Sequence, residues 1–202
     1  MSRGRERRRD VVVVTDADRR AQRIVVAAAA RLGLPVAASS RQCPTRISPA
    51  EVIDEIVRSP AEPVVVLADD GGARGRGPGE RLIAALAASP RVRLLAVVAV
   101  ASNAVPVRGV DVEEAVTSAG RLLVRKAVDK RGRPRSGRTL QGDTVDVLTD
   151  LAVPVVGVGD PGKMGSDDVD VIALALREAV RLGKRSTRRR RSHGTAGGGR
   201  AA

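Results

Sequence analysis

Acidic residues follow three apolar runs of this sequence. Asp16 and Asp18 come after residues 11–15, Asp69 and Asp70 after 64–68, and Asp160 after 153–158. Carboxylates that crowd together repel one another unless a cation neutralises them, and Ca²⁺ and Mg²⁺ prefer oxygen ligands of this kind. If the runs are neighbouring strands, the pattern predicts a divalent-metal site with Asp16, Asp18, Asp69 and Asp160 as ligands.

Two other roles for these carboxylates stay open. Short acidic side chains at the start of a helix or turn accept backbone N–H bonds, so Asp16, Asp69 and Asp160 can be structural caps. A strand that ends in Asp-x-Asp also suits a Mg²⁺-dependent phosphoryl-transfer or hydrolase-like enzyme, in which Asp16 attacks or Asp16 and Asp18 hold the metal. The remaining parts of such an enzyme are not evident in the sequence.

The loop at 69–80 contains five glycines and two arginines and leads into a helix near Pro78. Backbone N–H and guanidinium groups in such a loop can cradle an anion, and a mobile polar lid is the alternative. The loop lacks the Gly-Lys-Ser/Thr ending of a P-loop. Cys43 and His193 have no partners in the pattern that would support nucleophilic catalysis.

The elements that must position these residues follow from the apolar pattern. Continuous apolar runs of about four to eight residues are typical of strands buried on both faces. They occur at 11–15, 36–39, 64–68, 94–101 and 153–158, and helical patterns occur at 17–32, 49–58, 78–88, 143–151 and 168–182. The alternation predicts one α/β domain over residues 10–182, a doubly wound, mostly five-stranded parallel sheet with helices on both faces.

In such a sheet the carboxyl ends of the strands meet at one edge, where ligands bind. Ser102 and Asn103 follow the fourth run, so they join Asp16, Asp18, Asp69, Asp70 and Asp160 as predicted ligand-binding residues.

Residues 105–141 interrupt the alternation. Residues 114–118 and 122–128 flank the turn Ala119-Gly120 and predict a β-hairpin, inserted at an edge of the sheet or as a flap. Lys130 to Arg135 contains Arg-Gly-Arg-Pro, which matches the core of an AT-hook for the A·T minor groove. A tight turn that leaves the hairpin is the alternative.

The net charge of +13 is concentrated at the two ends of the chain. Residues 1–10 hold five arginines against two acidic residues, and residues 183–202 hold seven Lys and Arg with no acidic residue. We expect 1–9 and 183–202 to be disordered tails that attract polyanions, and solvated tails without a partner are the alternative. The absence of Phe, Trp and Tyr counts against the stacking of nucleobases and therefore against a single-strand nucleic-acid binder.

The apolar runs are far shorter than the roughly 18 residues of a membrane span, and the run after Arg9 ends too soon for an export signal. The single cysteine, Cys43, excludes an internal disulfide and fits a reducing compartment. These features predict synthesis in the cytoplasm without a signal peptide.

Six motifs, in this order, resemble the stage V sporulation protein AE family of spore-forming bacteria, in its soluble form. They are VTDAD, ADDGGARGRGPGE, VVAVASNA, AVDKRG, GDTVDVL and VPVVGVGDPGKMGSDD, within about residues 10–180. The residues that carry the resemblance are Asp16, Asp18, Asp69, Asp70, Gly75, Gly77, Gly79, Glu80, Ser102, Asn103, Gly142, Asp143, Thr144, Asp146, Gly159, Asp160, Gly162, Lys163 and Met164. The chain departs from the family pattern at Gly71, where a basic residue is expected, and at 169–174.

The resemblance implies a non-enzymatic role in the SpoVA system, which moves dipicolinic acid, chelated with Ca²⁺, into the developing spore and releases it in germination. It implies other SpoVA proteins at the spore inner membrane as partners, and it adds Asp143 and Lys163 to the predicted ligand-binding residues. Basic tails suit contact with anionic lipid in a protein that is peripheral to this membrane. Neither the oligomeric state nor the membrane partner follows from the pattern.

Overall fold

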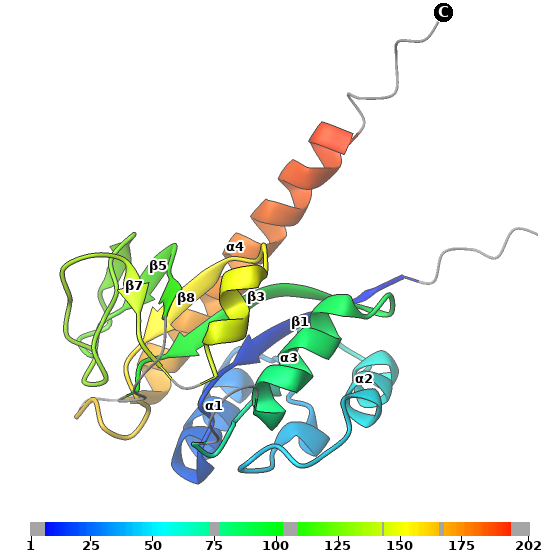
Figure 1. The fold of residues 1–202 in the computed structure, drawn as a ribbon, viewed down its shortest axis with the longest axis horizontal. Helices are drawn as coiled ribbons and strands as arrows, with labels where there is room; N and C mark the ends of the chain where they lie inside the picture. The colour runs from blue at the N-terminus through cyan, green and yellow to red at the C-terminus, as the bar shows by residue number, and fades with distance from the viewer. Residues whose placement is uncertain (1–6, 73–76, 103–108, 143, 166–167, 195–202) are drawn as a thin grey trace, which may run out of the picture.

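The computed structural model describes residues 7–72, 77–102, 109–142, 144–165 and 168–194 (Figure 1). Strands and helices alternate along most of the chain. In chain order the elements are β1 (Arg9–Val14), α1 (Arg19–Arg31), η1 (Ala38–Ser40), α2 (Pro49–Arg58), β2 (Val64–Leu67), α3 (Pro78–Ala88), β3 (Val92–Val100), β4 (Val110–Asp111), β5 (Glu114–Val116), β6 (Leu122–Val124), β7 (Thr139–Leu140), η2 (Asp146–Asp150), β8 (Val155–Val158) and α4 (Asp168–Gly194).

The main sheet has six strands in the order β2-β1-β3-β8-β5-β6. The first five are parallel, and β6 pairs with β5 in the antiparallel direction. The centre of the sheet is buried on both faces, and β1 accordingly contains a run of four valines, Val11 to Val14, each fully buried. The structure confirms the predicted α/β architecture and adds one antiparallel edge strand. β4 and β7 form a separate two-stranded sheet.

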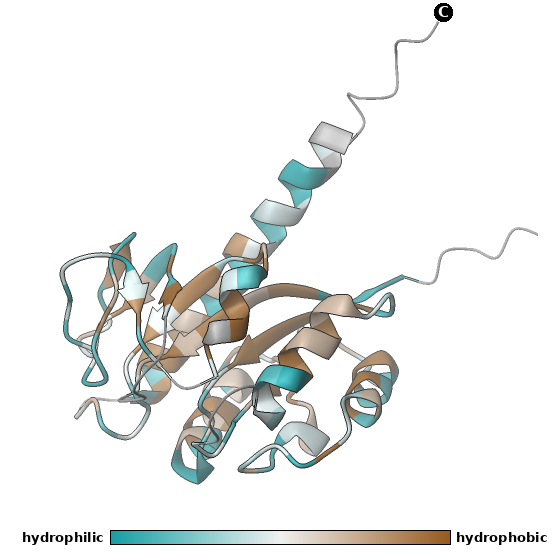
Figure 2. Cartoon of the chain, in the orientation of Figure 1, coloured by the Kyte–Doolittle hydropathy of each residue, from teal (hydrophilic) through white to brown (hydrophobic). Residues whose placement is uncertain are grey.

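Helices cover both faces of the sheet (Figure 1). On one face α1 and α4 lie side by side over a core that includes Val25, Ile172 and Leu176. On the other face α2, α3 and η2 pack over a second core that includes Ile56 and Leu82. In the hydropathy view the strands between the two layers are strongly apolar, whereas the last turns of α4 are polar (Figure 2). Both cores contain only aliphatic side chains and one methionine, since the chain has no aromatic residues.

The prediction of a strand at 36–39 is wrong. Val36 forms a single bridge with Val65 of β2, and the chain then turns into the 3-10 helix η1. The reason lies in α2, where the Glu55 carboxylate accepts hydrogen bonds from the backbone N–H groups of Ala38 and Ser39 at 2.6 and 2.9 Å. These bonds satisfy N–H groups that a strand would have given to a neighbouring strand.

The predicted hairpin is confirmed, because β5 and β6 pair across the Ala119-Gly120 turn. It lies at the edge of the main sheet and supplies the fifth parallel strand.

The helix expected at 143–151 is instead the shorter 3-10 helix η2, and residue 143 lies outside the described residues. The Arg-Gly-Arg-Pro segment is folded into a turn: the Asp129 carboxylate accepts bonds from Arg131 N and Arg133 N, and Val128 bridges Pro134. The turn interpretation therefore accounts for this motif.

α4 continues 12 residues past its expected end at 182. Residues 183–194, which the sequence pattern assigned to a disordered tail, are helical and project beyond the domain (Figure 1). Arg190 reaches back to the carbonyl oxygen of Ala152, and the Thr187 hydroxyl donates to the carbonyl of Gly183. Residues 1–6 and 195–202, which complete the two predicted tails, lie outside the described residues. No helix in the described ranges has both the length and the hydropathy of a membrane span.

Candidate functional site at the carboxyl edge of the sheet

The parallel strands bring most of the predicted site residues to one edge. The order β2-β1-β3-β8 places the carboxyl ends of four strands beside one another, with a change of winding direction between β1 and β3. The segments that follow these ends carry Asp69 and Asp70, Asp16 and Asp18, Ser102, and Asp160 and Lys163. Asn103 and Asp143 lie outside the described residues. We call the described group the carboxyl edge.

At the end of β1 the chain turns sharply into α1. Asp16 has a positive φ of 50°, which few non-glycine residues adopt, and the next turn places Asp18 at the N-cap of α1. The Asp18 carboxylate accepts hydrogen bonds from Arg20 N and Ala21 N, both at 2.8 Å. Asp18 therefore satisfies two N–H groups at the positive end of the helix dipole, which is a structural role.

Asp70 plays a similar part for α3 from a distance in the sequence. Its Oδ1 atom accepts from Gly79 N at 2.7 Å and from Glu80 N at 3.2 Å. A Cβ atom on Gly77 would lie 2.1 Å from the same oxygen, so a side chain at position 77 would collide with the Asp70 carboxylate. Two N–H groups of the first turn of α3, where an external anion could have bound, thus bind the carboxylate of Asp70. The loop residues 73–76 lie outside the described residues.

Lys163 places a positive charge at the carboxyl edge. Its ammonium group forms an ion pair with Asp160, and the hydrogen bond to Asp160 is the main cause that raises the pKa of Lys163, with Asp18 and Asp16 adding to the effect. The side chain therefore lies within electrostatic reach of three of the four predicted metal ligands. Nearby, Gly162 N donates to the Asp168 carboxylate at the start of α4.

The described side chains do not form the predicted metal site. Within the described ranges no three His, Cys, Asp or Glu side chains are grouped so that they could hold a metal ion. Asp18 faces the N–H groups of α1, and Asp160 faces a lysine ammonium. Capping was considered for Asp16, Asp69 and Asp160, whereas the residues that cap helices in the structure are Asp18 and Asp70. The binding of Ca²⁺ or Mg²⁺ stays a prediction from spacing.

Cys43 lies beside the carboxyl edge, although no sequence pattern indicates this. The loop that carries it lies against the end of β2, where Thr45 N donates to Asp69 O and Asp69 N donates to Thr45 Oγ1, both at 3.0 Å. Burial, together with a hydrogen bond to Asp69 and the charge of Asp69, raises the pKa of the Cys43 thiol from its ordinary 9.0 to about 11. These contacts join residues more than twenty positions apart, so local patterns cannot reveal them.

We expect the protonated state of Cys43 to be visible in its reactivity. At pH 8 iodoacetamide should alkylate the native thiol roughly 100-fold more slowly than the thiol of the urea-unfolded chain, because the thiolate is the nucleophile. Asp69→Asn should speed the native reaction, since it removes the carboxylate that disfavours the thiolate. Asp111→Asn, at an exposed ion pair with Arg138, is the matched control. Equal native and unfolded rates would contradict the burial of the thiol.

The same raised pKa has a consequence for stability. Because the pKa of Cys43 is higher in the folded chain than in the unfolded chain, folding favours the neutral thiol. The contribution of this thiol to the free energy of unfolding is therefore fully present below pH 9. It is lost as the pH rises from 9.0 towards about 11.

A protein-family model matches most of the chain. The family model described as stage V sporulation protein AE1 matches residues 10–182. The chain belongs to this family. The match covers the main sheet except for Arg9 at the start of β1, and it ends within α4, so the basic last turns of that helix lie beyond it. Searches of curated proteins and of solved structures gave no match.

In this stage V sporulation protein AE1 family member, motif residues at the carboxyl edge pack together. The position of Gly79 against the main chain of Asp69 leaves no room for a side chain, because a Cβ atom would lie 2.8 Å from Asp69 N and 2.9 Å from the methyl carbon of Thr144. The motifs ADDGGARGRGPGE and GDTVDVL therefore meet in space at Gly79 and Thr144. Their residues hold the edge together, whether or not a ligand binds there.

Proposed function

We propose that this protein is a non-enzymatic, peripheral component of the SpoVA sporulation system at the spore inner membrane. There it would work with other SpoVA proteins in the uptake or release of dipicolinic acid. Family membership supports the sporulation role. The observation that carries the peripheral location is the projecting end of α4, a helix that is continuous with the domain and rich in arginine.

The charge of this segment favours an anionic surface. Lys184, Arg185 and Arg188 are exposed, and residues 183–194 contain no acidic residue. A basic residue near an anionic leaflet contributes about 1 kcal/mol of attraction, and the attraction decays within a Debye length. A helix pays less ordering entropy on binding than a disordered tail, and the Arg190 bond to Ala152 ties the segment to the domain.

The carboxyl edge supports a binding or structural role more than catalysis. Asp18 is engaged as the N-cap of α1, so the phosphoryl-transfer alternative loses one of its two carboxylates. The Cys43 thiol, with its raised pKa, is a poor nucleophile at neutral pH. No observation on the described residues favours the enzyme alternative.

Vesicle binding tests the peripheral location. The full chain should sediment with vesicles that contain phosphatidylglycerol, and the bound fraction should fall as salt rises. The triple variant Lys184→Glu, Arg185→Glu, Arg188→Glu should bind at least about tenfold more weakly, since it reverses the charge of the segment. Its control, Arg23→Glu, Arg41→Glu, Arg58→Glu, changes the net charge equally at exposed sites elsewhere. Equal losses in the two variants would mean that net charge, and not the α4 segment, attracts the membrane.

The link to dipicolinic acid needs a separate readout. Spores whose only copy of the gene encodes the α4 triple variant should contain less dipicolinic acid than spores with the control variant. If the triple variant fails to bind vesicles but the spores hold normal dipicolinic acid, the transport role is contradicted while the membrane contact stands.

A further inference from the structure

β6 is an edge strand with open hydrogen-bonding groups. It is the last strand of the sheet, and it is bounded by the bonds from Thr117 N to Arg121 O and from Arg125 N to Glu113 O. Hydrogen bonds alternate along an antiparallel pair, so Leu123 directs its backbone groups toward β5. The backbone groups of Leu122 and Val124 therefore point to the open side, where a further strand can pair with them.

The same strand exposes apolar side chains. Leu122 is 40% exposed and Val124 is 65% exposed, and they are the large apolar residues that stay exposed among the described residues. Their cross-strand partners show which face they occupy: Val116, opposite Leu122, lies in the core under α4, and Glu114, opposite Val124, pairs with Arg181 of α4. Leu122 and Val124 therefore extend the face that α4 covers.

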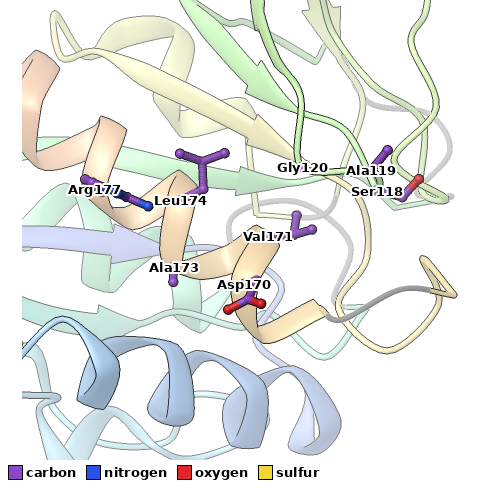
Figure 3. Close-up of a pocket in the computed structure, with 8 residues that line it drawn as sticks. All are labelled: Ser118, Ala119, Gly120, Asp170, Val171, Ala173, Leu174 and Arg177. Atoms are coloured by element: carbon purple, nitrogen blue, oxygen red, sulfur yellow. The ribbon is translucent and has the colours of Figure 1, made fainter.

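A groove lies on this face between α4 and the turn that precedes β6. It has a volume of about 450 Å³, and its walls are the turn at 118–120 and α4 residues between Asp170 and Arg177 (Figure 3). Val171 and Leu174 supply apolar surface, and Figure 3 shows the Leu174 side chain standing on the side of α4 that faces the hairpin. An extended segment along β6 would have apolar contacts on this side.

The charge around β6 indicates the kind of segment that fits. Arg121 precedes the strand and Arg125 and Lys126 follow it, and all three are exposed. Arg177 adds a further positive charge in the groove. The acidic neighbours on α4 are already in ion pairs: Asp170 with Arg31, and Glu178 with Arg181. An acidic partner is therefore favoured.

A second copy of this chain fits less well. A twofold antiparallel pairing of β6 with itself, centred on Leu123, places Arg121 of one copy opposite Arg125 of the other. Like charges directly opposite each other on paired strands are destabilising.

We propose that β6 binds an extended, acidic segment of a partner protein as an additional strand of the sheet. The backbone groups of Leu122 and Val124 provide the main-chain bonds, and their side chains and the α4 groove take the apolar residues of the segment. Arg121, Arg125 and Lys126 select acidic residues on it. This is the strand-addition mode of peptide recognition, in which the backbone gives affinity and the side chains give specificity.

The test uses the full-length protein and an array of nine-residue peptides that alternate Asp or Glu with Val or Leu. The control array carries Lys in place of the acidic residues. We expect the acidic peptides to bind at least about tenfold more tightly than the lysine peptides. On saturation with the tightest peptide, amide hydrogen exchange at Leu122 and Val124 should slow, which binding through charge alone would not cause.

Two variants separate the parts of the proposal. Val124→Pro removes an outward-facing N–H group but no hydrogen bond to β5. It should lower the affinity for the acidic peptides at least about tenfold. Arg125→Glu with Lys126→Glu, which keeps all backbone groups, should remove the preference for acidic peptides, whereas Arg23→Glu with Arg58→Glu should keep it. Equal binding of acidic and lysine peptides would overturn the proposal. So would a wild-type dimer in sedimentation equilibrium that Val124→Pro dissociates, because β6 would then bind a second copy.

Discussion

Asp70→Ala should lower the free energy of unfolding by about 2 to 4 kcal/mol, measured by urea denaturation of the full chain. Asp70 is 3% exposed, and its carboxylate accepts the N–H groups of Gly79 and Glu80 at the start of α3. Alanine leaves these two buried N–H groups without the carboxylate that accepts their hydrogen bonds. It also removes a negative charge from the positive end of the α3 dipole.

Asp70→Asn is the matched variant. Its carbonyl oxygen can still accept one or both bonds, but the charge is gone, so about half of the loss should remain. Asp150→Ala, at an exposed position at the end of η2, changes the net charge by the same amount. It should lower the free energy of unfolding much less than Asp70→Ala does. A loss below about 1 kcal/mol for Asp70→Ala would show that the carboxylate does not hold the loop and α3 together.

Gly183→Ala should destabilise the domain by about 1 to 3 kcal/mol, although alanine is the better helix former. In a solvent-exposed helix this substitution stabilises by about 1 kcal/mol. Here the glycine lies against β3, and an added Cβ atom would meet Leu95 at 2.6 Å from its Cβ and 2.7 Å from its carbonyl oxygen. The methyl group would push α4 off the sheet, so packing reverses the sign that helix propensity predicts.

Leu95 is a rigid neighbour for this contact. The pairing of β1 with β3 shifts register there, because Val11 pairs with Leu94 but Val12 pairs with Ala96. Leu95 is thus the extra residue of an irregularity in the strand, and it is 2% exposed. Ser186→Ala, one turn later in α4, is the control and should leave stability unchanged or slightly higher. If Gly183→Ala also stabilises, the end of α4 does not pack on β3.

The α/β class and most helices could be predicted because both depend on local patterns. Parallel strands buried on both faces must be continuously apolar, as Val11 to Val14 are. α2 begins and ends as expected, since Ser48 and Glu51 form a capping box at its start and Pro49 occupies the first turn. The β5–β6 hairpin could be placed from its Ala119-Gly120 turn. The meeting of Asp16, Asp69 and Asp160 at one edge follows from parallel strands alone.

What these carboxylates do could not be predicted, because their partners come from other parts of the chain. Spacing alone cannot show that Asp70 caps a helix that begins eight residues later, or that Lys163 lies among the carboxylates. Cys43 was missed for the same reason, since Asp69 reaches it only in the folded chain.

The sequence by itself determined which segments are strands and helices wherever burial imposes a periodic pattern on them. Tertiary contacts decided the cases in which a partner from elsewhere satisfies or blocks the backbone. Glu55 of α2 takes the N–H groups of 38–39 and turns an apolar run into η1. Gly183 resembles a helix stop, yet the helix continues through it because Gly183 packs against Leu95 of β3. In both cases the deciding atoms are distant in sequence, so the outcome is fixed only when the layers come together.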